Sequence, residues 1–179
     1  MPSTKVKYGF GFDPGINEAA WAIVGTDGSV TLRLIRNKFK KGNKVKLDNW
    51  AKLEIVLGEI QEILGDALKH FPKLESWTCE AQYCTRIGDP AHMVRLGWIS
   101  SMAYTMGAGK AKRIIAVPAT WTRNKPKELR HPELLEGLQD EEKWTWVGPQ
   151  APKSLMHNCY DSVGLALWGL AQTLEKQNV

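Results

Sequence analysis

The sequence has no apolar run long enough to span a membrane, and its first residues lack the apolar centre of a secretory signal peptide. It also has little cysteine: Cys79, Cys84 and Cys159 form no Cys-x-x-Cys pair and, being three, cannot all be bridged. These absences argue against a membrane protein and against a disulfide-stapled secreted domain. We therefore expect a protein of a reducing compartment, the cytoplasm.

There is no internal repeat, no low-complexity tract and no sign of a second domain in the 179 residues. This length is enough for one domain with a substantial core, and we expect a single domain over residues 1–179. The net charge of +5 and the pI of about 9.1 indicate moderate basicity, which suits a polyanionic partner without proving one.

Residues 5–15 alternate between apolar and small or polar side chains, which predicts a strand with one buried face. The apolar positions are Val6, Tyr8, Phe10 and Phe12. The other face carries Gly9, Gly11 and, at its end, Asp13, before Pro14-Gly15 stops the strand. A short acid beside bare backbone can hold a metal ion or lie near a phosphate. It can equally be an Asx-type residue that opens a turn.

The rest of the chain predicts two more antiparallel strands, then helices alternating with strands. The expected strands are 17–25, 29–36, 75–80 and 113–117, and the expected helices begin near 48, at 89–90 and at 155. Between 120 and 146 the pattern is poor, and we expect a loop with a short helix. In the middle helix, Gly97 and Ser101 are small residues at helical spacing, suited to internal packing or to a dimer contact.

Two further acids lie where they can join Asp13. Glu80 ends the fourth expected strand, and a helix before that strand implies a crossover and parallel pairing with the first strand. Asp13 and Glu80 would then lie side by side. Asp161 lies off the apolar stripe of the last helix, with Asn158 and His157 three and four residues before it on the same side.

Basic residues gather in two stretches. The first, residues 33–46, carries seven basic residues and no acid, and the second surrounds Arg123, Lys125 and Lys127. Each stretch is either a solvated loop or an arm that contacts phosphates. The candidate phosphate-binding residues are Arg36, Lys38, Lys40, Lys41, Lys44, Arg123, Lys125 and Lys127.

This order of elements is that of the ribonuclease H-like fold, an α/β fold with a mixed five-stranded sheet and helices on both faces. Within that fold the chain resembles the RuvC family of Holliday junction resolvases, including a bacteriophage branch. The resemblance covers nearly the whole chain, and its anchors are 11–15 (GFDPG), 79–83 (CEAQY), 117–118 (VP) and 161–166 (DSVGLA).

The resemblance implies a homodimeric, Mg²⁺-dependent endonuclease that nicks four-way DNA junctions, in a bacterial cell or a phage-infected host. Asp13, Glu80 and Asp161 would hold two cations, for which Mn²⁺ could substitute, and Tyr83 would stack on bases at the junction centre. The family has an acid or a histidine three residues before the helix aspartate, whereas this chain has Asn158 there. Asn158 could be a weak metal ligand, and His157 could act as base or ligand, or only form a local hydrogen bond.

Other readings stay open at this point. A nuclease for RNA–DNA hybrids or flaps, or a transposase-like domain, would use the same acids. A nucleotide-binding protein of the actin and hexokinase type also begins with an Asp-x-Gly turn, which Asp13-Pro14-Gly15 fits, although it needs a second lobe. A junction-binding protein without catalysis is a further alternative.

Overall fold

The computed structural model describes residues 5–36, 48–81, 90–118, 121 and 127–176. Its centre is a six-stranded mixed sheet in the order β5-β4-β1-β2-β3-β6. The strands are β1 (Tyr8–Asp13), β2 (Glu18–Gly25), β3 (Val30–Arg36), β4 (Leu74–Ala81), β5 (Ala111–Pro118) and β6 (Thr145–Trp146). As predicted, β1, β2 and β3 are antiparallel, and β4 is parallel to β1.

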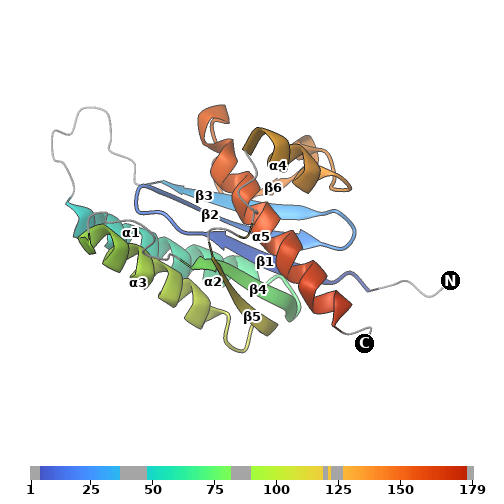
Figure 1. Cartoon of the computed structure of the whole chain (residues 1–179), viewed down its shortest axis with the longest axis horizontal. Coiled ribbons are helices and arrows are strands. Elements are labelled where there is room, and N and C mark those ends of the chain that lie inside the picture. The colour runs from blue at the N-terminus through green and yellow to red at the C-terminus, as the bar shows by residue number, and fades with distance from the viewer. Residues whose placement is uncertain (1–4, 37–47, 82–89, 119–120, 122–126, 177–179) are drawn as a thin grey trace.

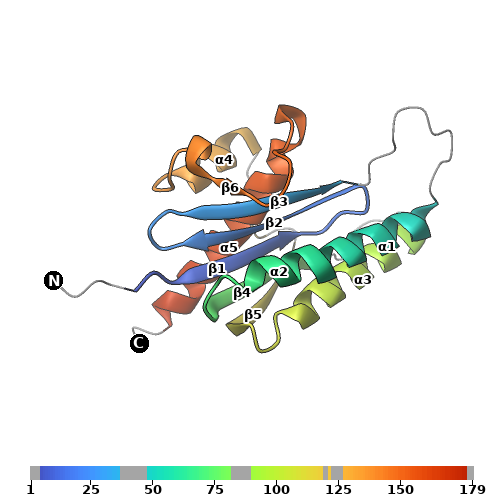
Figure 2. The same ribbon diagram turned by 180° about the vertical axis from the view of Figure 1, so that it is seen from behind.

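Helices cover both faces of this sheet (Figure 1, Figure 2). They are α1 (Asn49–Glu59), continued by a π-helical stretch (Ile60–Leu64) and α2 (Gly65–Leu68), then α3 (Pro90–Met106), α4 (Lys127–Leu135) and α5 (Met156–Glu175). Helices α1, α2 and α3 lie on one face, while α5 crosses the other face with α4 beside it. Asp48 caps α1 by accepting hydrogen bonds from the amides of Trp50 and Ala51.

The glycine face of β1 is not bare, which corrects the expectation of a strand with one buried face. A Cβ on Gly11 would lie 2.1 Å from the carbonyl oxygen of Ser162, and one on Gly9 would lie 2.7 Å from that of Ala166. The two glycines therefore admit the backbone of α5 rather than a phosphate. Both faces of β1 are buried because helices pack on both sides.

The sheet has one strand more than the predicted five. Thr145–Trp146 pairs in parallel with Thr31 and Leu32 of β3, and it is only two residues long. It follows the short helix that was expected in the poorly patterned stretch, which is α4, and a single 3₁₀ turn (Glu141–Lys143). A second 3₁₀ turn (Lys153–Leu155) leads into α5.

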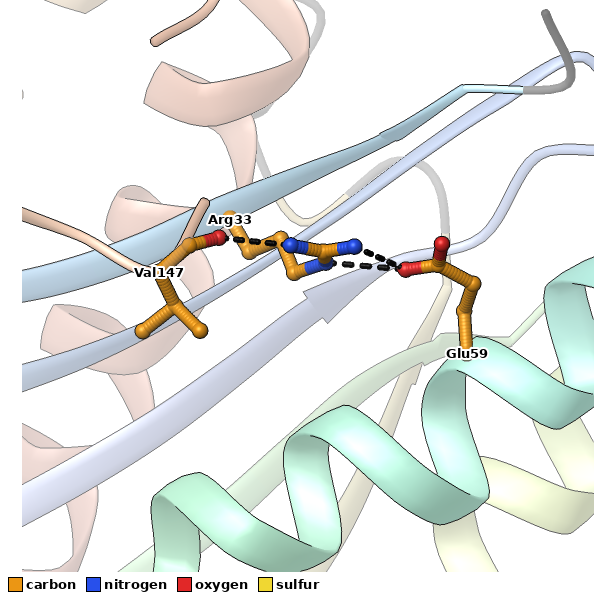
Figure 3. A network of polar contacts seen from close by, with 3 residues as sticks. All are labelled: Arg33, Glu59 and Val147. Atoms are coloured by element: carbon orange, nitrogen blue, oxygen red, sulfur yellow. Dashed lines mark hydrogen bonds and ion pairs between the residues drawn. The ribbon is translucent and has the colours of Figure 1, made fainter. Parts of the chain in front are cut away.

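Arg33 of β3 connects the β3–β6 edge of the sheet to helix α1. Its guanidinium donates to the carboxylate of Glu59 in α1, with Nε at 2.9 Å, and its Nη1 donates to the carbonyl oxygen of Val147 at 2.7 Å (Figure 3). The Arg33 side chain is only 12% exposed. Arg33 belongs to the basic stretch 33–46, but its charge is engaged inside the protein and not presented to a phosphate.

Two buried clusters, one on each face of the sheet, form the core. Phe10 stacks on Trp77 at 3.8 Å between ring centroids on the α1 and α3 side, while Val163 and Cys159 pack against β2 and β3 on the other side. Cys79 and Cys159 are free and buried. Among the helices that the structure describes, none combines the length and the apolar character needed to cross a bilayer.

Candidate active site

Asp13 and Glu80 come from neighbouring strands. Asp13 is the last residue of β1, and Glu80 lies one residue before the end of β4. The strands run in parallel with Phe12 opposite Cys79, so the next step of the register brings Asp13 beside Glu80. Both side chains are partly buried. The backbone placement of this pair agrees with the crossover argument from the sequence.

The close contact between α5 and β1 brings Asp161 to the same end of the sheet. Ser162, the next residue of α5, lies against Gly11, two residues before Asp13. Burial raises the pKa of the Cys159 thiol in α5 to about 12, and the nearby negative charge of Asp13 raises it in the same direction. Asp161 is 8% exposed, which is a low value for a charged residue.

Glu80 is held by a tryptophan that sequence reasoning did not assign to the site. The indole Nε1 of Trp121 donates to Oε2 of Glu80 at 3.2 Å. The far edge of the same indole lies against Gly164 of α5, where an added Cβ would be 2.7 Å from its ring. Trp121 thus bridges β4 and α5. Its only sequence signal is that a tryptophan in a poorly patterned stretch needs something to pack on.

Asp161 is held in a similar way by a histidine from α4. Nε2 of His131 lies 3.0 Å from Oδ1 of Asp161, and both side chains are 12% exposed. The His131 ring packs against Tyr160 with 5.1 Å between centroids, and the Tyr160 hydroxyl donates to Glu141 at 2.8 Å. Burial and this bond to Glu141 raise the pKa of Tyr160 to about 12. Sequence reasoning missed His131 because nothing local distinguishes it.

His157 and Asn158 lie in the first turn of α5 and are both partly buried. Their spacing places them one turn before Asp161, as expected. The histidine nitrogen found against Asp161, however, is that of His131. The participation of His157 or Asn158 in the site stays a prediction.

The donor set is of the kind that Mg²⁺ binds, because carboxylate oxygens are its preferred protein ligands. Within the described residues, however, no three acidic, histidine or cysteine side chains are arranged to hold a metal ion. One oxygen of Glu80 and one of Asp161 accept from ring nitrogens. The residue types and the backbone placement of the three acids fit a divalent cation.

A groove of about 420 Å³ opens beside Glu80 between the ends of β4 and β5 and the helix α3. Its lining includes Glu80, Ser101, Tyr104 and Thr105. Tyr104 is 42% exposed and presents an aromatic ring at the surface of α3. A ligand could approach Glu80 through this groove.

Most of the candidate DNA-binding residues fall outside the described part of the chain. These are Tyr83, Lys38, Lys40, Lys41, Lys44, Arg123 and Lys125. Arg36 ends β3 and is exposed, and Lys127 begins α4. The role of all of these residues in binding phosphates or bases stays a prediction.

No protein-family model and no curated protein matches this sequence. Solved structures do: Thermus thermophilus RuvC in complex with a Holliday junction substrate matches with a TM-score of 0.59 and 14% identity over 97% of each chain. A second structure of Thermus thermophilus RuvC matches with a TM-score of 0.50 and 18% identity, again over 97% of each chain. At sequence identities this low, the structural similarity shows the fold alone. The chain therefore has the ribonuclease H-like fold of RuvC, as its resemblance to that family predicted.

Proposed function

We propose that the protein is a divalent-metal-dependent endodeoxyribonuclease that nicks four-way and related branched DNA junctions. The observation that carries the proposal is the meeting of three acid-bearing segments at one end of the sheet: the end of β1, the end of β4 and the second turn of α5. A structure with the same fold, over almost its whole length, holds a Holliday junction substrate.

In this proposal Asp13, Glu80 and Asp161 hold the cations, with His157 or Asn158 completing the set. Bound Mg²⁺, or Mn²⁺ in its place, would activate a water for attack on the phosphodiester and stabilise the leaving oxygen. The protein residues would fix the position of the cations because Gly11, which has no Cβ, lets α5 pack closely on β1. Asp13 of the strand and Asp161 of the helix would then both contribute ligands.

The remaining assignments concern DNA. Tyr83, three residues after Glu80, is proposed to stack on unpaired bases at the junction centre, where stacking is worth about 1–3 kcal/mol per base. The basic residues of 36–44 and 123–127 are proposed to contact phosphates, and such contacts position the nucleic acid without reading its sequence.

A homodimer would place two such sites on opposing strands of a junction. The face formed by α1 and α3 supports this part of the proposal. Trp98 and Val94 of α3 are 51% and 50% exposed, and Trp98 lies 5.2 Å from the ring of Trp50 in α1. A Cβ on Gly97 would meet no atom within 4 Å, so internal packing does not require a glycine there.

The proposal is tested by incubating the protein with labelled DNA in Mg²⁺ or in EDTA. The substrates are a four-way junction, a flap, a replication fork and an RNA–DNA hybrid duplex. We expect paired nicks in the four-way junction that require the metal ion. Preferred cleavage of the hybrid or the flap would assign the protein to another ribonuclease H-like activity. Binding of the junction without cleavage in either cation would indicate a binding protein.

A further inference from the structure

We infer that His131 and Trp121 are positioning residues, each of which orients one of the proposed metal-binding carboxylates through a ring N–H. The inference rests on the proposed metal site. The two contacts are alike in kind: an aromatic nitrogen meets a single carboxylate oxygen, Nε2 of His131 with Oδ1 of Asp161 and Nε1 of Trp121 with Oε2 of Glu80. Neither ring comes from a strand or helix that carries one of the three proposed ligands.

The chemistry of each pair fixes the direction of its hydrogen bond. An indole nitrogen only donates, and an ionised carboxylate only accepts, so Trp121 donates to Glu80. The tautomer of His131 with its hydrogen on Nε2 donates to the Asp161 carboxylate in the same way. Each bond engages one of the two oxygens of its carboxylate and limits the rotation of that carboxylate. Partners of this kind orient metal ligands and raise the affinity of a site.

Packing holds both rings in place. Trp121 lies against Gly164, where its ring would be 2.7 Å from an added Cβ, so the glycine leaves the space that the indole needs. The His131 side chain is 12% exposed and its ring contacts that of Tyr160. Rings fixed in this way lose little freedom when they hold a carboxylate, which is the requirement for preorganising a site.

The two rings also connect α5 to neighbouring parts of the chain. Trp121 connects the end of β4 to α5, and His131 connects α4 to α5. These contacts are made in addition to the contact at Gly11 that packs α5 on β1. The residues between 120 and 146 thus supply donors for the site, although they contribute none of the proposed ligands.

The test is a calorimetric Mn²⁺ titration of the full chain, accompanied by thermal unfolding without metal. His131→Phe keeps a ring against Tyr160 but removes the donor, whereas His131→Gln places an amide N–H near the former Nε2. We expect His131→Phe and Trp121→Phe each to weaken Mn²⁺ binding by about tenfold or more, and His131→Gln to stay within about threefold of the unaltered protein. Trp77→Phe is the matched control, because it loses an indole bond to the carbonyl oxygen of Ala103 on the other face of the sheet.

The outcomes separate this inference from the proposed function. Unchanged Mn²⁺ affinity in both His131→Phe and Trp121→Phe, with binding intact in the unaltered protein, would overturn the inference alone. Equal losses in His131→Gln and His131→Phe would overturn the donor role and make the imidazole itself a ligand. A loss in Trp77→Phe as large as in Trp121→Phe would show that the effect comes from general destabilisation. If the unaltered protein binds no Mn²⁺, the proposed metal site fails together with the inference.

Discussion

At Gly11 the first strand packs directly against the backbone of the last helix. A methyl group there would lie 2.1 Å from the carbonyl oxygen of Ser162 and 2.4 Å from the amide nitrogen of Ala166, and neither backbone atom can move alone. We expect Gly11→Ala to lower the free energy of unfolding by about 1–3 kcal/mol or more, measured by urea denaturation. Gly58→Ala is the control, since a Cβ at Gly58 would meet no atom within 4 Å. This helical glycine should tolerate alanine or gain up to about 1 kcal/mol.

Glu80 is the residue whose change tests the chemistry most directly. Glu80→Gln removes a charge and leaves the shape, so we expect junction cleavage to be lost while junction binding in EDTA is kept. Binding does not suffer because removing a negative charge does not weaken phosphate contacts. Glu54→Gln, a change at an exposed glutamate of α1, is the control and should cleave normally. Cleavage by Glu80→Gln at the rate of the unaltered protein would contradict the assignment.

His157 and Asn158 are distinguished by their separate alanine variants. If His157 takes part in the reaction, His157→Ala should lower the single-turnover cleavage rate by more than about tenfold, or about 1.4 kcal/mol in transition-state stabilisation. Asn158→Ala should then be mild, and Asn158→Asp should tolerate the loss of His157. An inactive Asn158→Ala with an active His157→Ala would transfer the role to Asn158.

At the scale of elements, Arg33 joins β3, α1 and the segment after β6. Arg33→Met keeps most of the volume but leaves the Glu59 carboxylate and the Val147 carbonyl oxygen without this donor. We expect a loss of about 1.5–3 kcal/mol in the free energy of unfolding, since hydrogen bonds to charged groups contribute about this much. Lys69→Met breaks a pair with Asp66 that is 72% and 74% exposed, and it should change stability by less than about 0.5 kcal/mol. Equal effects of the two changes would refute this role of Arg33.

The strands and long helices could be predicted because their signals are local. Alternation along β1, the cap at Asp48 and the periodic stripe of α5 each lie within one element, and a helix before β4 implied its parallel pairing. The two residues of β6 carry no such pattern and gain their strand conformation only by pairing with β3. Local sequence patterns also did not predict that α5 would cover the glycine face of β1.

The candidate site divides in the same way. Asp13, Glu80 and Asp161 could be selected because each lies at a recognisable position of a predicted strand or helix. The partners of two of them could not, because His131 is 30 residues from Asp161 and Trp121 is 41 residues from Glu80. Arg33 was grouped with a basic loop for the same reason, since its partner Glu59 lies 26 residues away.

At the scale of the whole molecule, the exposed aromatic face of α1 and α3 can be tested through the oligomeric state. If a second copy covers this face, Trp98→Glu should convert a dimer into a monomer, because it would bury a charge without a partner. Sedimentation velocity at micromolar concentration measures the change. Ala171→Glu adds the same charge at an exposed position of α5, on the other side of the sheet, and should leave the dimer intact. A Trp98→Glu variant that sediments like the unaltered protein would place the contact elsewhere.

The contact between β1 and α5 also has a consequence for the order of events during synthesis. Asp13 leaves the ribosome about 150 residues before Asp161, so the glycine face of β1 stays uncovered while most of the chain is made. Closing so distant a contact is slow compared with forming the β1–β2–β3 hairpins. While α5 is still inside the ribosome, the folded part of the chain lacks Asp161, one of the three acids. The proposed nuclease should therefore be inactive until its last helix has docked.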